Sequence, residues 1–122
     1  MKYSKSIEMY LKTIYILEKQ HGHAHVVDIA EYLDLAKPSV TKAMDRLKNE
    51  ELIDKESYGH ITLTAKGQQV SEAIYHRYEL ITLFLQQSLN LSANEASINA
   101  CRMEHILTEE MVRAIERYVK EI

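Results

Sequence analysis

The sequence of 122 residues has little of several residue types on which other protein classes depend. One cysteine excludes an intramolecular disulfide framework, and one proline with three glycines is too few for the many turns of a β-sandwich or barrel. No apolar run approaches the roughly 20 residues that cross a bilayer, and the N-terminus has no stretch like a signal peptide. We therefore expect a mainly helical, cytoplasmic protein with no membrane partner.

Charge is distributed unevenly along the chain, although the net charge is only −3. Residues 1–66 carry ten Lys and Arg against ten Asp and Glu, whereas residues 67–122 carry five against eight. A neutral first half can still present a local basic face, so the acidic total does not exclude nucleic-acid binding.

Hydrophobic periodicity and stop signals predict three helices and a hairpin in the first half. The expected elements are a helix that ends at Gln20-His21-Gly22, a helix over Val26–Leu33, a helix from Pro38 to about Asn49, an extended segment from Leu52-Ile53, a turn at Tyr58-Gly59-His60 and a strand over Ile61-Thr62-Leu63-Thr64. Two short helices followed by a β-wing form a winged helix-turn-helix pattern. In the second half, Thr64 is expected to cap a long helix from Ala65, and shorter helices follow at about 93–107 and 108–118.

The helix that Pro38 opens is polar and of a size that fits the major groove of DNA. Near its start, base edges are within reach of Ser39, Thr41 and Lys42. Contacts to phosphates suit Lys37, Arg46 and Lys48. The predicted DNA-binding residues are Lys37, Pro38, Ser39, Thr41, Lys42, Arg46 and Lys48. The alternative is a small helical bundle whose lysines only solvate a surface; we favour DNA binding because of the added wing.

A second functional signal lies at Cys101-Arg102-Met103-Glu104-His105. In a helix, Cys101, Glu104 and His105 share one face, because they stand at i, i+3 and i+4. Thiol, carboxylate and imidazole together suit a divalent transition metal rather than calcium or magnesium. On spacing alone, a buried structural thiol beside a surface Glu-His pair is the favoured interpretation, since unpaired Cys is often buried.

Motifs along the whole chain resemble the diphtheria toxin repressor and manganese transport regulator family. They are Ser6-Ile7-Glu8-Met9-Tyr10-Leu11-Lys12-Thr13-Ile14-Tyr15, Asp28-Ile29-Ala30, Pro38-Ser39-Val40-Thr41, Leu63-Thr64, Gly67 and Ala100-Cys101-Arg102-Met103-Glu104-His105. The resemblance implies a metal-activated, homodimeric repressor that binds a double-stranded DNA operator of metal-uptake genes. It implies a winged helix-turn-helix DNA-binding domain in residues 1–66 and an α-helical metal-binding and dimerisation domain in residues 67–122. We expect the two-domain form without the SH3-like domain of iron-responsive members.

The resemblance also implies a four-residue metal site made by Met9, Cys101, Glu104 and His105. The two sulfur donors favour Fe(II), with Mn(II) as the alternative and Co(II), Ni(II) or Zn(II) as substitutes in vitro. We expect no small organic ligand. Nor do we expect an enzyme, because the sequence has no Ser-His-Asp order, Gly-rich phosphate loop or zinc-protease motif.

Three positions depart from the family pattern. Where members have a second metal position, this chain has Tyr78, Thr82 and Ser97, which are poor ligands, so we expect one metal per subunit or a rearranged second site. His76 and Glu79 offer a displaced pair, but solvated polar residues are the favoured interpretation.

The alternating histidines at 21, 23 and 25 are interpreted as a solvated turn, because no cysteine or carboxylate is expected to converge on them. Two alternative functions stay open: a winged-helix regulator without metal control, and a metal-buffering or interaction protein.

Overall fold

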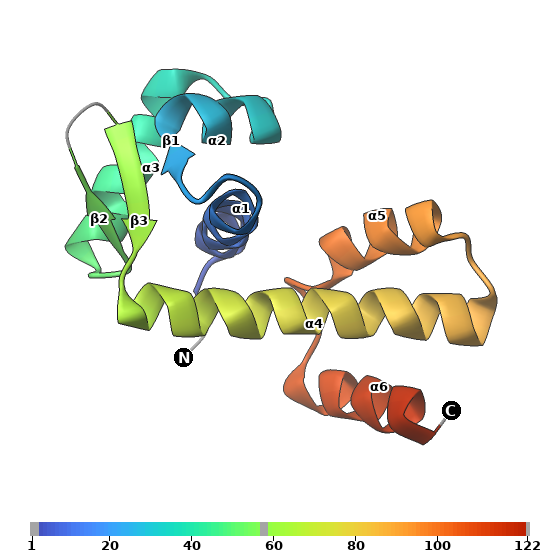
Figure 1. The fold of residues 1–122 in the computed structure, drawn as a ribbon. Coiled ribbons are helices and arrows are strands. Elements are labelled where there is room, and N and C mark those ends of the chain that lie inside the picture. Colours follow the sequence, from blue (N-terminus) through green and yellow to red (C-terminus); the bar gives the residue numbers. More distant parts are fainter. Residues whose placement is uncertain (1–2, 57–58, 122) are drawn as a thin grey trace. The chain divides into compact units, whose positions relative to one another are not determined.

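The computed structural model describes residues 3–56 and 59–121, and it has the expected mainly helical fold with a small antiparallel sheet. In chain order the elements are α1 (Lys5–His21), β1 (Ala24–His25), α2 (Val26–Leu33), α3 (Lys37–Asn49), β2 (Ile53–Lys55), β3 (His60–Leu63), α4 (Ala65–Leu89), α5 (Ala93–Met103) and α6 (Glu109–Glu121). The chain forms two compact units, residues 1–72 and 73–122, with α4 continuing from the first into the second (Figure 1).

Helix α1 is the central helix of the first unit. It begins where the Ser4 hydroxyl accepts a hydrogen bond from the Ile7 backbone N–H, at 3.3 Å. It ends at Gly22, whose φ of 79° requires the left-handed region that glycine enters without steric cost. Its apolar stripe is fully buried at Leu11 and Ile14, so helical periodicity and the glycine stop predicted this element correctly.

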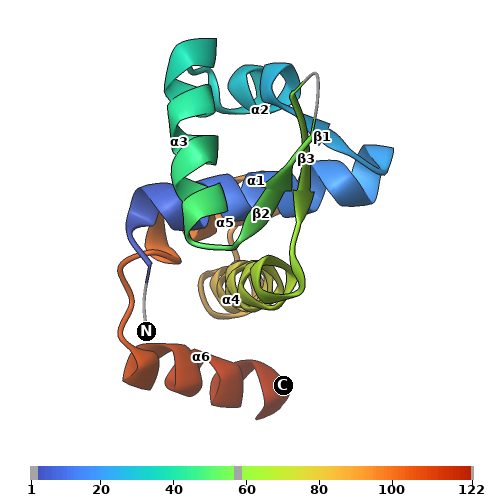
Figure 2. The ribbon, with the colours of Figure 1, turned by 90° about the vertical axis from the view of Figure 1, so that its left-hand side faces the viewer.

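Helices α2 and α3 form the predicted helix-turn-helix. Helix α2 ends at Asp34, which has φ 55°, and α3 begins with Pro38 in its first turn, as expected from the fixed φ of proline. The side chains of α3 that pack inward are Val40, Met44 and Leu47. Their i, i+4, i+7 spacing leaves the opposite face of α3 to solvent (Figure 2).

The wing is a hairpin of β2 and β3, in which Asp54 pairs with Thr62. Tyr58, which we expected in its turn, lies outside the described residues. Strand β3 also pairs with β1, placing His25 opposite His60, so the sheet order is β1-β3-β2. Strand β1 was not predicted, because its two residues are too short to give a periodic signal.

A close backbone contact fixes where α4 begins. Thr64 caps the helix as predicted, since its hydroxyl accepts a hydrogen bond from the Gly67 N–H at 3.0 Å, and its own N–H donates to the Leu52 carbonyl at 3.1 Å. A Cβ on Gly67 would lie 1.9 Å from that carbonyl oxygen. Only glycine therefore fits at this position without movement of the backbone.

In the second unit, α5 and α6 pack against α4 (Figure 1). The buried core consists of Leu80, Ile81, Leu85, Ala96, Ala100 and Ile115. An edge-to-face contact between Phe84 and Tyr118, with ring centroids 5.3 Å apart, joins α4 to α6. Within the described residues no helix is long and apolar enough to span a membrane.

The contact at Gly67 yields a stability prediction. Gly67→Ala should lower the free energy of unfolding by about 3 kcal/mol, because the new methyl group collides with backbone rather than with a movable side chain. Gly22→Ala, where the added Cβ meets nothing within 4 Å, should cost only about 1 kcal/mol for the left-handed conformation. Thermal unfolding followed by circular dichroism measures both. If both variants lost the same free energy of unfolding, the backbone at the Leu52 carbonyl would be able to shift at little cost.

Candidate metal centre and nucleic-acid interface

The predicted metal motif lies at the C-terminal end of α5, and of its three candidate ligands only Cys101 is inside the helix. Helix α5 ends at Met103 rather than near Leu107, so our expected helix was too long. The reason is a tight turn in which the Ile106 N–H bonds to the Met103 carbonyl at 3.0 Å, three residues back instead of four. Glu104 is the C-cap residue, and His105 follows in the turn.

Glu104 and His105 form a buried polar pair. The Glu104 Oε1 and His105 Nε2 atoms lie 3.0 Å apart, and the two side chains are 0% and 2% exposed. Burial of a carboxylate is costly unless a charged or hydrogen-bonding group compensates it, and a cation is such a group. A carboxylate oxygen and an imidazole nitrogen this close together could both bind one divalent metal ion.

Cys101 lies one helical turn before Glu104 and is exposed. The expectation of a buried structural thiol is therefore wrong, and an accessible thiol remains suitable as a soft ligand. The fourth predicted ligand, Met9, lies half-buried on α1 in the first unit. Its backbone carbonyl accepts a hydrogen bond from the Thr13 hydroxyl at 2.8 Å. Its participation with the three residues of the second unit stays a prediction.

The positions of the family's second metal are occupied by a hydroxyl network. The Tyr78 and Ser97 hydroxyls are hydrogen-bonded to each other, and the Thr82 hydroxyl donates to the Tyr78 carbonyl at 2.9 Å. This network links α4 to α5 with neutral groups that are weak metal ligands. His76 lies 3.9 Å from Glu116 of α6, an ion-pair distance when the imidazole is protonated.

The histidines after α1 are not merely a solvated turn, so our interpretation of them was wrong in one respect. A carboxylate does converge on them, because Asp28, in the first turn of α2, meets His23 and His25. The missed signal is an acidic residue three positions after an N-cap residue, which commonly reaches back to the cap. His21 is exposed and not part of this group.

The predicted DNA-contacting residues lie on α3 and are mostly exposed. Lys37, Pro38, Ser39, Lys42, Arg46 and Lys48 are exposed, and Thr41 is half-buried. Ser39, Lys42 and Arg46 follow one another at three- and four-residue spacing, so they share a face. Arg46 is 68% exposed, and its 3.9 Å contact to Glu50 is a weak surface pair that leaves the guanidinium accessible.

This face also borders a groove of about 490 Å³ between the start of α1 and α3. Its lining includes polar residues that we did not predict, among them Ser6 and Asn49. Asn49 continues the spacing of Lys42 and Arg46 by three residues, so helical periodicity alone could have identified it. A contact from the start of α1 has no such sequence signal.

Two models of protein families together match nearly the whole chain. The model described as "Iron dependent repressor, N-terminal DNA binding domain" matches residues 2–61, and that described as "Iron dependent repressor, metal binding and dimerisation domain" matches residues 64–122. The chain belongs to the iron-dependent repressor family. Because this is a family of transcriptional repressors, membership confirms that the chain is not an enzyme.

Individual members of the iron-dependent repressor family differ in their metal. The iron-dependent repressor IdeR of Mycobacterium tuberculosis is 32% identical over 108 residues, 88% of this chain and 47% of IdeR. The solved structure of the manganese regulator SloR has a TM-score of 0.79 at 30% identity, covering 98% of this chain and 55% of that one. This chain thus spans about half the length of both.

A third relative matches nearly end to end. An uncharacterized HTH-type transcriptional regulator of Methanocaldococcus jannaschii is 30% identical over 118 residues, which cover 96% of this chain and 94% of that protein.

The metal motif can be tested by removing its thiol. Cys101→Ala should weaken Fe(II) binding at this motif by more than about 100-fold, because loss of a ligand costs more than the 10- to 100-fold effect of losing a contact to a ligand. Tyr78→Phe, which removes only a hydroxyl of the α4–α5 network, should change affinity little. Anaerobic titration of both variants decides, and equal affinities would remove Cys101 from the metal site.

The α3 face yields a prediction for DNA. Lys37→Ala combined with Arg46→Ala should weaken binding to all duplexes similarly and reduce the slope of log affinity against log salt by about two. Arg113→Ala combined with Lys120→Ala, two exposed basic residues of α6, serves as the charge-matched control. Fluorescence anisotropy over a salt series measures both. An unchanged slope in the double variant would place the DNA on another face.

Proposed function

We propose that this chain is a metal-dependent, DNA-binding transcriptional repressor that acts as a homodimer and controls metal-uptake genes, with Fe(II) as its corepressor. The observation that carries the proposal is the buried Glu104–His105 pair, one turn from the Cys101 thiol, in a chain whose first unit is a winged helix-turn-helix. Metal ligands and a DNA-binding fold in one chain match the functions in the two family descriptions.

The donor chemistry supports Fe(II) over Mn(II). Manganese prefers oxygen ligands, whereas the proposed set of Met9, Cys101, Glu104 and His105 includes two sulfur atoms. Relatives named for iron and for manganese both match this chain, so Mn(II) is the alternative. Co(II), Ni(II) and Zn(II) suit the same donors and should replace iron in vitro.

The mechanism we propose is restraint of the DNA-binding domain by the metal. Residues 1–66 form that domain and include Met9, whereas residues 67–122 include the other three ligands. These four residues would hold the cation, whose coordination would restrain the two domains relative to each other. Through its thioether, Met9 would limit the movement of α1 and so favour the arrangement of α3 that binds DNA.

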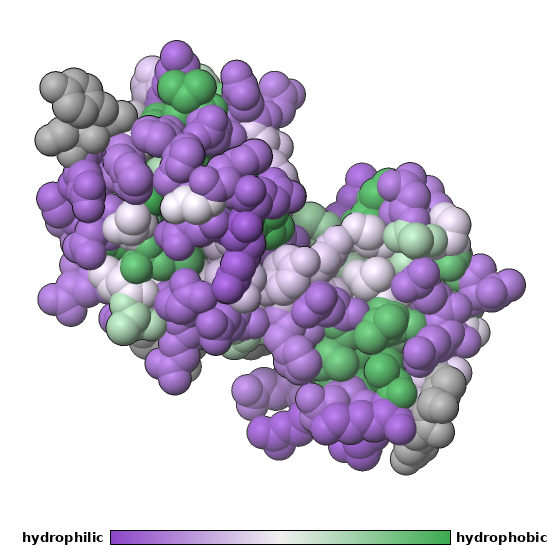
Figure 3. Space-filling view, in the orientation of Figure 1, coloured by the Kyte–Doolittle hydropathy of each residue, from purple (hydrophilic) through white to green (hydrophobic). Residues whose placement is uncertain are grey.

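Exposed apolar residues support a homodimer through the second unit. Among the described residues, six of the nine exposed large apolar side chains lie there: Leu83, Leu89, Ile98, Ile106, Met111 and Tyr118. Figure 3 shows hydrophobic residues gathered over α4 and α6 on one face. Contiguous apolar surface on a soluble domain commonly marks an interface.

Coupling between the metal and DNA tests the proposal. In the wild type, saturating Fe(II) should raise operator affinity by about 5- to 150-fold, the usual 1–3 kcal/mol of coupling. Met9→Ala should retain a cation at the other three ligands but lose most of that enhancement. Ile16→Ala, which truncates another half-buried residue of α1, should keep it. Operator affinity is measured anaerobically with and without Fe(II).

Each other outcome points to a different function. A wild-type enhancement in Met9→Ala would make Met9 an ordinary packing residue and assign the metal effect to another route, such as dimerisation. No enhancement in the wild type would favour a winged-helix regulator without metal control. Metal binding with no salt-dependent duplex binding would favour a metal-buffering or interaction protein.

A further inference from the structure

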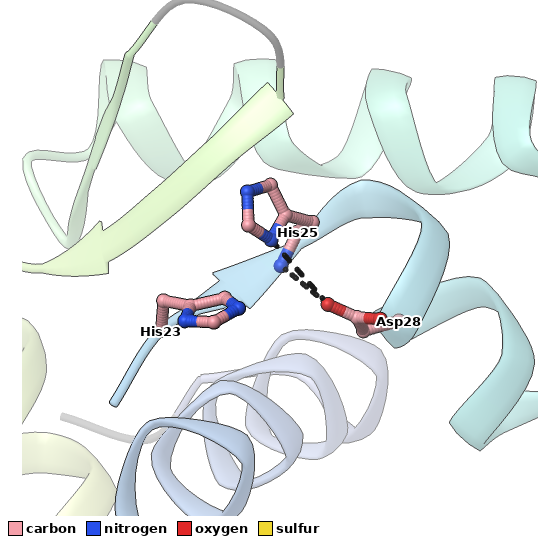
Figure 4. A group of neighbouring side chains, drawn as sticks. All are labelled: His23, His25 and Asp28. Atoms are coloured by element: carbon pink, nitrogen blue, oxygen red, sulfur yellow. Dashed lines mark hydrogen bonds and ion pairs between the residues drawn. The ribbon is translucent and has the colours of Figure 1, made fainter. Parts of the chain in front are cut away.

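A second group of metal-ligand side chains lies wholly within the first unit. His23 stands before β1, His25 is on β1 and Asp28 is in the first turn of α2. One possible ligand atom from each residue lies within 4.8 Å of the others. Figure 4 shows the three side chains gathered at the junction of β1 and α2.

The spacing of these groups is close to that of ligands on a single ion. Two ligand atoms on a tetrahedral ion with bonds of 2.0–2.2 Å lie about 3.4 Å apart. The His25 Nδ1 and Asp28 Oδ2 atoms are 3.5 Å apart. Two imidazoles on such an ion have ring centroids about 5 Å apart, and those of His23 and His25 are 4.7 Å apart. Small side-chain rotations would complete the geometry.

A fourth residue of the same chemistry borders the group. His60 of β3 faces His25 across the strand pair, and its ring centroid is 5.2 Å from that of His25 and 5.9 Å from that of His23. Three imidazoles and one carboxylate are an unusually dense set of transition-metal ligands for so small a surface. Sheet register, rather than sequence proximity, brings His60 to this place.

Asp28 also has a structural role, which does not conflict with metal binding. Its Oδ2 accepts a hydrogen bond from the His25 backbone N–H at 3.2 Å and so caps α2. That oxygen has a further lone pair, and the carboxylate has a second oxygen, so the cap leaves acceptor positions for a metal. The positive end of α2 opposes a nearby cation, but this effect is weak at an exposed terminus, and the Asp28 charge counteracts it.

We propose that His23, His25 and Asp28 bind a divalent transition cation of the Zn(II) or Co(II) type, with His60 beside them as a fourth ligand. The cation would join β1, α2 and β3, and thereby tie the wing to the helix-turn-helix. It would stabilise the DNA-binding unit by preferential binding to the folded state. The inference goes beyond the proposed function and does not depend on it, because none of these residues belongs to the Cys101 motif.

Binding of Co(II) to the full chain tests the proposal, in a Cys101→Ala background that weakens the other motif. This variant should still bind one Co(II) per chain, with the visible spectrum of a site that lacks sulfur. His23→Ala with His25→Ala added should remove that binding. Asp28→Asn, which keeps an oxygen for the cap, should weaken it at least 10-fold. The matched control is His21→Ala, an exposed histidine of the same segment, which should leave binding unchanged.

Equal Co(II) binding with and without His23 and His25 would overturn the proposal, as would binding seen only at millimolar metal. Circular dichroism verifies that each variant is folded. If the double variant does not fold, His23→Gln decides instead, because His23 makes no contact in the α2 cap and its loss should still lower affinity at least 10-fold. Failure of the proposed function appears separately, as loss of the Cys101-dependent binding in the wild-type chain.

Discussion

The backbone of β3 and the residue after it join the other parts of the DNA-binding unit. Strand β3 is hydrogen-bonded to β1 on one side and to β2 on the other. The Leu63 N–H donates to the Glu18 carboxylate of α1 at 2.9 Å, and the next N–H, of Thr64, donates to the Leu52 carbonyl. A short strand with bonds in every direction cannot slip in register without breaking all of them. Both the wing and the start of α4 therefore depend on β3.

The second unit depends on a different kind of interaction. Its helices meet through apolar residues, but Glu104 and His105 place an ionisable pair in buried surroundings. Such a pair stabilises a fold weakly, because loss of hydration offsets most of the attraction between its members. The metal-binding role proposed for these two residues would account for the pair better than a contribution to stability does. By contrast, the hydroxyls of Tyr78 and Ser97 satisfy each other and require no metal.

Regular periodicity made most of the fold predictable from sequence, and local exceptions account for the rest. The helices of the first unit carry clear apolar stripes and stop signals, so their bounds were nearly correct. Strand β1 and the early end of α5 were missed, because two residues give no period and the Met103 turn has no sequence mark. The Asp28 contact was missed because it depends on a cap, and the approach of His60 depends on strand register.

Two proposed groups of metal ligands in one chain would change how metal dependence has to be interpreted. The Cys101 motif includes sulfur, whereas the His23 group offers only nitrogen and oxygen, yet borderline cations such as Co(II) and Zn(II) suit both. A cation at the His23 group would stabilise the DNA-binding unit, and any effect that it had on operator affinity would not require Met9. Coupling between metal and DNA binding can therefore be assigned to the Cys101 motif only when the number of metal ions bound per chain is known. By linkage, each bound metal changes DNA affinity by the factor by which its own affinity differs between the DNA-bound and the free protein.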